Sequence, residues 1–390
     1  MERKTMMLIS GGLLAAILTF VTNWLALIPW RRSEGKHWAE RSRLYHPVRV
    51  AAAPNLWVIP AVLTLSFFLL WPKESPHWIF MASVTALGAV SGTIPMDREA
   101  FPRISLNDLL RQSAVNWVVR FLMWFVFLGA IALMPEDLEI QSLIVPVSVL
   151  ALCILWNREG WILTGKKLGL VLPPTERLQN IVRATAARMN VSFKDVYRLR
   201  SSLAQAYAMP DSRRLLFSER LLQLLSDNEI AAICAHELAH LTETRSIYYK
   251  RYVSWLVFLP WIFFKPMVHY LGLMGFFILL WTSVLAPLLA RSISHKLELR
   301  ADHIAHMNDP DEGTYARALA MLYEDNLLPA VNAKKRATHP HLYDRLLSAG
   351  LTPDFPRPAP PQATAWHGVL FSAALGMLAM VVMIRQTEHF

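Results

Sequence analysis

The chain has little charge and little cysteine for its length. Charged residues make up only 17% of its 390 residues, whereas hydrophobic residues make up 54%. Soluble globular domains carry roughly a quarter of their residues as charged side chains, so this composition argues against an ordinary soluble protein. The two cysteines, Cys153 and Cys234, are too few for a disulfide framework.

The basic excess of the chain has a specific distribution. The formal net charge is +10 at pH 7, a value also found in nucleic-acid-binding proteins. Here, however, most lysines and arginines lie beside apolar runs, where the positive-inside rule of membrane proteins accounts for them. We therefore expect a lipid bilayer as a partner and no nucleic acid. The sequence does not indicate an oligomeric state.

Eight segments are mainly apolar and are predicted to be membrane helices, for which about 20 residues are needed. Five precede a mixed polar stretch, two form a close pair with Lys265-Pro266 at the expected turn, and one lies near the C-terminus. This pattern predicts a multi-pass integral membrane protein. The predicted spans are Met6–Trp30, Pro54–Trp71, Trp78–Pro95, Val115–Met134, Gln141–Trp156, Tyr252–Phe264, Val268–Ala290 and Ala365–Ile384.

The charges between the spans predict an orientation. Lysine and arginine gather in the loops at 31–53 and 96–114, whereas the loop at 135–140 is acidic. With eight spans, both basic loops and the polar stretches fall on one side, which the positive-inside rule assigns to the cytoplasm. The expected organisation is an N-terminal membrane region (1–156), a polar domain in two parts (157–250 and 291–361) around a two-span hairpin (251–290), and a C-terminal span (362–390).

The polar domain shows both helical and strand patterns and is predicted to be a mixed α+β domain. Its serines and aspartates stand where helix N-caps are expected. The predicted elements are a helix at 178–190, strands at 196–199, 204–208 and 215–217, a helix from the N-cap Ser218 to Leu225, and a longer helix from the N-cap Asp227 to Leu241.

The longer predicted helix contains the motif His236-Glu237-Leu238-Ala239-His240. A spacing of four residues places both imidazoles on one helix face, where they can share one tetrahedral zinc ion. Glu237 can take a proton from a metal-activated water and return it to a leaving amine. The same pattern also arises by chance, as a histidine pair on a polar helix face, so a third ligand must decide.

A second predicted helix supplies that ligand. Glu298 is expected to complete the zinc site, and Asp302, one turn later, to hydrogen-bond a ligating histidine and fix its tautomer. The alternative is a charged helix in water, which nearby basic residues would also fit. Taken with the upstream motif, the pattern predicts one zinc ion per chain, bound by His236, His240 and Glu298.

Several further motifs follow one another in a recognisable order: Ala206–Pro210, Leu215–Ser218, Asn228–Ile230, His236–His240, Leu297–Asp302, and Thr338–Pro340 with Arg345. In this combination, over roughly residues 174–350, the chain resembles the membrane zinc metallopeptidases that include the type I CAAX prenyl endopeptidases and HtpX. Five spans before the metal-binding helix resemble the CAAX branch more. The fold class implied is a multi-span α-helical membrane protein with a mixed α+β zincin-like metallopeptidase domain.

The resemblance implies that an extended substrate pairs with an edge strand, here Gln205-Ala206-Tyr207-Ala208. The family's strand usually reads Asn-Ala-Phe-Ala. Because Gln205 stands where asparagine is usual, its anchoring of the strand, and with it the substrate's alignment, is left open. A prenylated substrate does not follow from the sequence.

The resemblance also implies roles for two residues downstream. His339 and Arg345 could stabilise the tetrahedral oxyanion opposite zinc. The alternative is a turn histidine before Pro340 and an arginine held in a salt bridge. Both residues are retained as predicted catalytic residues, with Glu237 as the general base.

The predicted function is that of a zinc-dependent, membrane-integrated endopeptidase acting on membrane or membrane-associated polypeptides. One alternative is an antirepressor-type sensor metallopeptidase, which would be expected to carry an extracellular ligand-binding domain after its membrane helices. Another is a non-catalytic membrane scaffold or chaperone that retains a zinc site, against which the intact Glu237 argues.

Overall fold

The computed structural model describes residues 2–70, 78–243, 259–309, 311–333, 340–362 and 374. The chain divides into two units, one formed by residues 1–121 and 358–390 and the other by residues 122–357. The predicted span Ala365–Ile384, except for residue 374, and residues 252–258 of the predicted span Tyr252–Phe264 lie outside the described residues.

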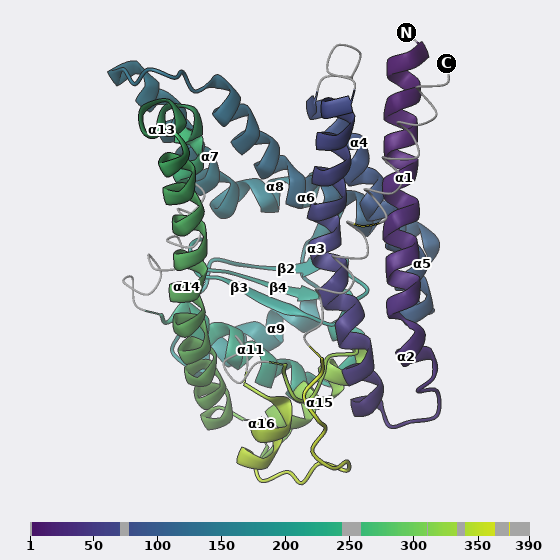
Figure 1. The fold of residues 1–390 in the computed structure, drawn as a ribbon. Coiled ribbons are helices and arrows are strands. Elements are labelled where there is room, and N and C mark those ends of the chain that lie inside the picture. The colour runs from purple at the N-terminus through teal and green to yellow at the C-terminus, as the bar shows by residue number, and fades with distance from the viewer. Residues whose placement is uncertain are drawn as a thin grey trace. The chain divides into compact units, whose positions relative to one another are not determined.

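The first unit is helical (Figure 1), and small residues let two of its helices touch. A Cβ atom added to Gly88 would lie 2.0 Å from the carbonyl oxygen of Gly12, and one added to Gly92 would lie 2.4 Å from that of Ala16. Such close crossings between small residues are typical of membrane helix pairs. The helices are α1 (Glu2–Ala26), α2 (Ile28–Arg31), α3 (Trp38–Leu70), α4 (Trp78–Ser91), α5 (Ile94–Ala100) and α6 (Leu106–Leu133), the last of which continues into the second unit.

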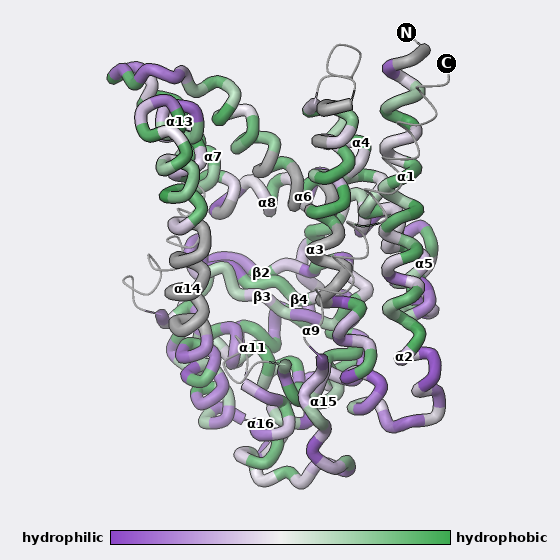
Figure 2. The backbone as a smooth tube through the Cα atoms, viewed as in Figure 1, coloured by the Kyte–Doolittle hydropathy of each residue, from purple (hydrophilic) through white to green (hydrophobic). Residues whose placement is uncertain are grey.

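Among the described residues, three helical segments are long and apolar enough to cross a membrane: Lys4–Ala26, Trp78–Ala100 and Ile140–Lys167. They coincide with three of the predicted spans, and Figure 2 shows the hydrophobic residues along α1 and α4. The predicted spans at 54–71 and 115–134 are helical where described, within α3 and α6, and their crossing of a membrane stays a prediction.

The loop that the sequence predicted at 31–53 is limited to residues 32–37. The backbone is helical from Trp38 and continues without interruption through α3. Charged residues led to the loop prediction, but they pair along the helix, as Arg43 does with Glu40 at 2.6 Å. Because side chains three residues apart are neighbours on a helix, a charged sequence is compatible with helical structure here.

The second unit begins with a long helical stretch and contains a small sheet (Figure 1). The helical backbone continues past the predicted boundary at residue 156 to Lys167, through a π-helical turn. Arg214, buried on the sheet, pairs with Glu159 of that turn at 2.9 Å. The stretch comprises η1 (Ile140–Leu143), α7 (Ile144–Leu155), η2 (Trp156–Gly160) and α8 (Trp161–Lys167).

The sheet has four strands among the described residues, in the order β1-β2-β4-β3. β2 and β4 are parallel, whereas β3 is antiparallel to β4 and forms an edge. The three predicted strands are confirmed, and the two-residue β1 was too short to be recognised. The strands are β1 (Val171–Leu172), β2 (Asp195–Leu199), β3 (Ala206–Met209) and β4 (Arg214–Ser218).

The three helices predicted in the first part of the polar domain are present. Ser218 caps α10 by accepting from the Leu221 backbone N–H, as predicted. The N-cap of α11 is Ser226, however, and not Asp227, because Ser226 forms a reciprocal capping box with Glu229. The helices of this unit are α9 (Glu176–Arg188), α10 (Glu219–Leu224), α11 (Asp227–Leu241), η3 (Leu259–Phe263), α13 (Phe264–Leu271), α14 (Leu273–Met307), α15 (Thr314–Asp325) and α16 (Leu342–Ser348).

The turn predicted at Lys265-Pro266 was placed wrongly. Pro266 lies in the first turn of α13, where a missing N–H breaks no helical hydrogen bond. The turn occurs instead at Gly272, whose φ of +55° is readily adopted only by glycine. From there α14 runs as one helix to Met307. The second apolar segment of the pair and the segment carrying Glu298 are therefore a single rigid element.

Candidate metal centre

The two motif histidines lie on α11, which is buried along most of its length. His236 and His240 are 8% and 7% exposed, and Glu237 between them is 9% exposed. The helix packs against α9, α14, α15 and the edge strand β3. This burial excludes the interpretation of a histidine pair on a polar helix face, since buried polar groups require specific partners.

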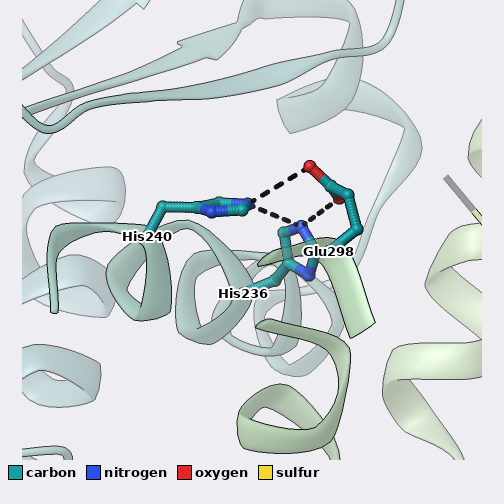
Figure 3. A group of neighbouring side chains, drawn as sticks. All are labelled: His236, His240 and Glu298. Carbon is teal, nitrogen blue, oxygen red and sulfur yellow. Dashed lines mark hydrogen bonds and ion pairs between the residues drawn. The ribbon is translucent and has the colours of Figure 1, made fainter. Parts of the chain in front are cut away.

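Possible ligand atoms of three side chains converge from two helices (Figure 3). The Nε2 atoms of His236 and His240 are 3.3 Å apart. The Glu298 carboxylate, from α14, has one oxygen 3.5 Å from Nε2 of His236 and the other 3.7 Å from Nε2 of His240. Ligand atoms of a tetrahedral zinc ion, each at about 2.1 Å, are separated by about 3.4 Å. The spacing therefore fits one zinc ion.

The hydrogen bonds of the two rings also favour a cation between them. Nδ1 of His240 lies 2.7 Å from a Glu243 oxygen, and Nδ1 of His236 lies 2.6 Å from the Tyr315 hydroxyl. A proton on each Nδ1 leaves a lone pair on each Nε2. Two lone pairs would then face each other across 3.3 Å, which a positive charge between them makes favourable.

The charges around His236 act in the same direction. Burial disfavours the imidazolium, but hydrogen bonds to Asp302 and Glu298 and the charge of Glu237 outweigh it and raise the pKa of His236 to about 9. The pocket therefore has a net preference for positive charge. A zinc ion satisfies this preference, and the ring must give up a proton to bind it.

Behind His236, Asp302 is in place as a supporting carboxylate. Its Oδ1 lies 3.2 Å from Nδ1 of His236 and accepts hydrogen bonds from the Tyr315 hydroxyl at 2.7 Å and from Arg345 at 2.5 Å. Burial raises the pKa of the Asp302 carboxyl, but the bond with His236 and the charge of Arg345 outweigh it and lower the pKa overall. Asp302 is thus held as a carboxylate.

The helix that carries Glu298 also binds the end of α11. Arg300 donates a hydrogen bond of 2.7 Å to the Thr242 hydroxyl at the C-cap of α11. A cation at a helix C-terminus is favoured by the helix dipole. Arg300 therefore fixes α14 against α11 within one turn of the third ligand, which helps to hold Glu298 in register with the histidines.

The predicted substrate strand corresponds to β3 and the residue before it. Gln205 is fixed on both sides, because its N–H donates to the Ser218 hydroxyl at 2.9 Å and its side-chain amide donates to the Ser201 hydroxyl at 3.0 Å. The Tyr207 hydroxyl donates to the Gln205 side-chain oxygen at 2.6 Å. Gln205 thus anchors the strand locally, and the hydroxyl that distinguishes Tyr207 from phenylalanine is part of that anchor.

The strand β3 packs against α11, the helix that carries the two motif histidines and Glu237. Ahead of the strand, the Asn326 side chain binds both the N–H and the carbonyl of Ala204, at 3.0 and 2.6 Å. Asn326 is the C-cap of α15, so this helix supports the strand as well as the metal centre.

The residues predicted downstream have different positions. His339 lies outside the described residues. Arg345, on α16, donates to Asp302 and to Tyr315, on the Nδ1 side of His236, which is opposite the ligand atom Nε2. Its predicted role at the oxyanion stays a prediction, and its observed contacts are those of a residue that holds Asp302.

Four residues that contribute to the site were not recognised in the sequence: Tyr315, Glu243, Arg300 and Asn326. Glu243 stands three residues after His240, a common spacing for surface pairs on helices, and carries no distinguishing signal. The others depend on contacts between elements far apart in the chain. Tyr315, for example, comes from 79 residues beyond His236.

Residues 173–349 match peptidase family M48. The chain carries an M48 peptidase domain. The matched region contains the motif helix, Glu298, Asp302 and Arg345, and it confirms the predicted relationship to the family of CAAX prenyl endopeptidases and HtpX. No curated protein matches the chain. With its apolar helices and this M48 domain, the chain is a membrane-associated metallopeptidase, and its predicted fold class is confirmed.

Proposed function

We propose that this M48 protein is a zinc-dependent endopeptidase, integrated in a membrane, that cleaves membrane or membrane-associated polypeptides. The observation that supports it most directly is the convergence of His236, His240 and Glu298 at 3.3–3.7 Å, with Glu237 next to the first ligand. These are the residues that would bind one zinc ion. A bound zinc ion would lower the pKa of a water molecule and polarise the scissile carbonyl.

The side chains around the centre have distinct tasks in this proposal. Glu237 takes a proton from the attacking water and transfers it to the leaving amine nitrogen. Asp302 and Glu243 keep the protons of the two imidazoles on Nδ1. The edge strand β3 pairs with the extended substrate backbone and presents the scissile bond to the centre. The role of His339 as an oxyanion donor is part of the same proposal.

The membrane location of the substrates is supported by the continuity of α14. Its first part belongs to the predicted span Val268–Ala290, and Glu298 follows on the same helix. Figure 2 shows hydrophobic residues near the start of α14 and hydrophilic ones toward its end. We propose that the eight predicted spans place the M48 domain in the cytoplasm, beside the bilayer surface.

Replacement of the general base tests the proposed function. Glu237→Gln should retain about one zinc ion per chain and lose peptidase activity by several orders of magnitude, because ligation survives while the base is lost. The control Glu324→Gln, at an exposed position on α15, should leave both quantities unchanged. Zinc content by mass spectrometry and cleavage of a membrane-protein mixture by proteomics measure the two effects.

Two results would contradict the proposal. Undiminished cleavage by zinc-loaded Glu237→Gln would exclude Glu237 as the base. Stoichiometric zinc in the wild-type protein without cleavage of any polypeptide would favour the non-catalytic scaffold instead. The inactive, zinc-loaded variant can also trap substrates, which identifies them by mass spectrometry of the captured polypeptides.

A further inference from the structure

Tyr315 is a fully buried residue at the start of α15 whose hydroxyl lies at the centre of the hydrogen-bond network behind His236. The hydroxyl oxygen is 2.6 Å from Nδ1 of His236, 2.7 Å from Oδ1 of Asp302 and 2.8 Å from a guanidinium nitrogen of Arg345. The phenol ring stacks on the imidazole, with ring centres 5.6 Å apart and planes inclined by 20°. Tyr315 therefore contacts His236 through both its ring and its hydroxyl.

The direction of each hydrogen bond follows from the chemistry of the partners. Arg345 can only donate, and the Asp302 carboxylate can only accept. The Tyr315 hydroxyl therefore donates its one proton to Asp302 and accepts from Arg345. Its remaining lone pair accepts from N–H of Nδ1 in His236. The one proton and both lone pairs of the hydroxyl then take part in hydrogen bonds. Nε2 of His236 is left with the lone pair that a metal ion requires.

The distances show which partner accepts the hydrogen bond from the N–H at Nδ1 of His236. Nδ1 lies 2.6 Å from the Tyr315 oxygen but 3.2 Å from the nearer Asp302 oxygen. On the other ring, Nδ1 of His240 meets the Glu243 carboxylate directly at 2.7 Å. The two histidines are thus supported differently: His240 by a carboxylate in direct contact, and His236 by a carboxylate whose effect is transmitted through a tyrosine hydroxyl.

We propose that Tyr315 is a positioning residue for the metal centre, which transmits the charge of Asp302 to His236 and fixes both the tautomer and the tilt of that ring. This inference rests on the proposed zinc site. Without the hydroxyl, Asp302 keeps its pairing with Arg345, and the His236 proton has only the 3.2 Å contact to Asp302. The ring then loses orientation and basicity, and zinc binds less tightly.

Removal of the hydroxyl alone tests this role. Tyr315→Phe keeps the ring and its packing, and it should lower the affinity for zinc by about 10–100-fold in competition with a chelator. The visible absorption of the cobalt(II)-substituted protein should also shift, because the ligand field of His236 changes. The control Tyr197→Phe removes a hydroxyl that accepts a hydrogen bond from the exposed Lys166, at 3.0 Å, and should leave affinity and spectrum unchanged.

A double-mutant comparison distinguishes transmission from independent effects. If the charge of Asp302 acts through Tyr315, then Asp302→Asn should weaken zinc binding much less in the Tyr315→Phe background than in the wild type. Additive losses would overturn the proposal, as would an affinity of Tyr315→Phe within twofold of the wild type with an unchanged cobalt spectrum. A wild-type protein that binds no zinc would refute the proposed function itself, which keeps the two failures distinguishable.

Discussion

In both histidines of this centre, a contact at Nδ1 fixes the orientation and tautomer of the ring, and thereby prepares Nε2 on the opposite side to bind a metal ion. His236 and His240 present Nε2 to Glu298, while Nδ1 of each ring is held by an acidic group or by a hydroxyl bound to one. An imidazole that donates from Nδ1 to a carboxylate is more basic at Nε2 and is fixed in one tautomer. In the proposed zinc site, the affinity for the metal would therefore depend on residues that do not contact it.

Glu243 allows this dependence to be measured. Its side chain is only 2% exposed and contacts Nδ1 of His240 at 2.7 Å. We expect Glu243→Ala to lower zinc affinity by about 10–100-fold, the usual effect of removing such a partner. Glu243→Gln, which keeps an accepting oxygen but loses the charge, should have a smaller effect. Chelator competition measures both, with Glu324→Gln as the exposed control.

Glu298→Ala shows how large the loss of zinc is when a proposed ligand itself is removed, and the Glu243 variants are compared with it. Loss of a ligand should remove zinc almost completely, since two histidines and water form a weak site. If Glu243→Ala and Glu298→Ala were equally deficient in zinc, Glu243 would have to be reassigned as a ligand. An affinity of Glu243→Ala equal to that of the wild type would show that the buried contact has no influence on the metal.

The convergence of the proposed ligands could be anticipated from the sequence because the spacing within each pair is fixed by helix geometry. His236 and His240 lie one turn apart on α11, and so do Glu298 and Asp302 on α14. Tyr315 could not be found in this way, because its contact with His236 requires α15 to pack against α11. The periodicity of a sequence segment shows which of its residues share one face of a helix. It does not show which other helix packs against that face.

At the scale of whole elements, helices rather than loops determine the geometry of the centre. α11 supplies the two histidines, and α14 supplies Glu298 and the capping residue Arg300. α15 supports both His236 and the segment that leads into β3. The end predicted for α11 at Leu241 was correct and its start was one residue late, at the N-cap Asp227 instead of Ser226, because apolar spacing and capping residues are local features that place a helix to within about one residue. The turn at Gly272 was missed because Pro266, six residues earlier, gave a stronger but misleading turn signal.

The crossing of α1 and α4 gives a prediction at this scale. A methyl group on Gly88 would lie 2.0 Å from the backbone oxygen of Gly12, which cannot move without separating the two helices. Gly88→Ala should therefore destabilise the first unit by about 1–3 kcal/mol, the range typical of overpacking. Thermal unfolding in detergent, followed by circular dichroism, measures the change.

The matched control has the opposite expected sign. A methyl group on Gly129, in α6, would meet nothing within 4 Å. Gly129→Ala should leave stability unchanged or raise it by up to about 1 kcal/mol, because alanine is the better helix former. Equal melting temperatures for Gly88→Ala and the wild type would mean that the two helices are not in such close contact in the membrane.

At the scale of the whole molecule, the proposed function makes the distance between the metal centre and the bilayer decisive for which bonds can be cleaved. The predicted span ends at Ala290, and Glu298 follows eight residues later on the same uninterrupted helix. At 1.5 Å per residue, this separation corresponds to about 12 Å along the helix axis. Composition and charge predicted the spans, whereas the rigid connection between span and ligand became evident only from the continuity of α14.

This spacing predicts where membrane-anchored substrates are cut. An extended chain advances about 3.3 Å per residue, so a bond about four residues outside the bilayer reaches the depth of the centre. We expect cleavage of a single-span substrate within about four to eight residues of its span. When glycine-serine segments of increasing length are inserted next to the span, the cut should stay at this distance and therefore move into the inserted segment. Mass spectrometry of the released fragments locates each cut, and a cut that follows the original sequence regardless of spacing would show that distance from the membrane does not select the bond.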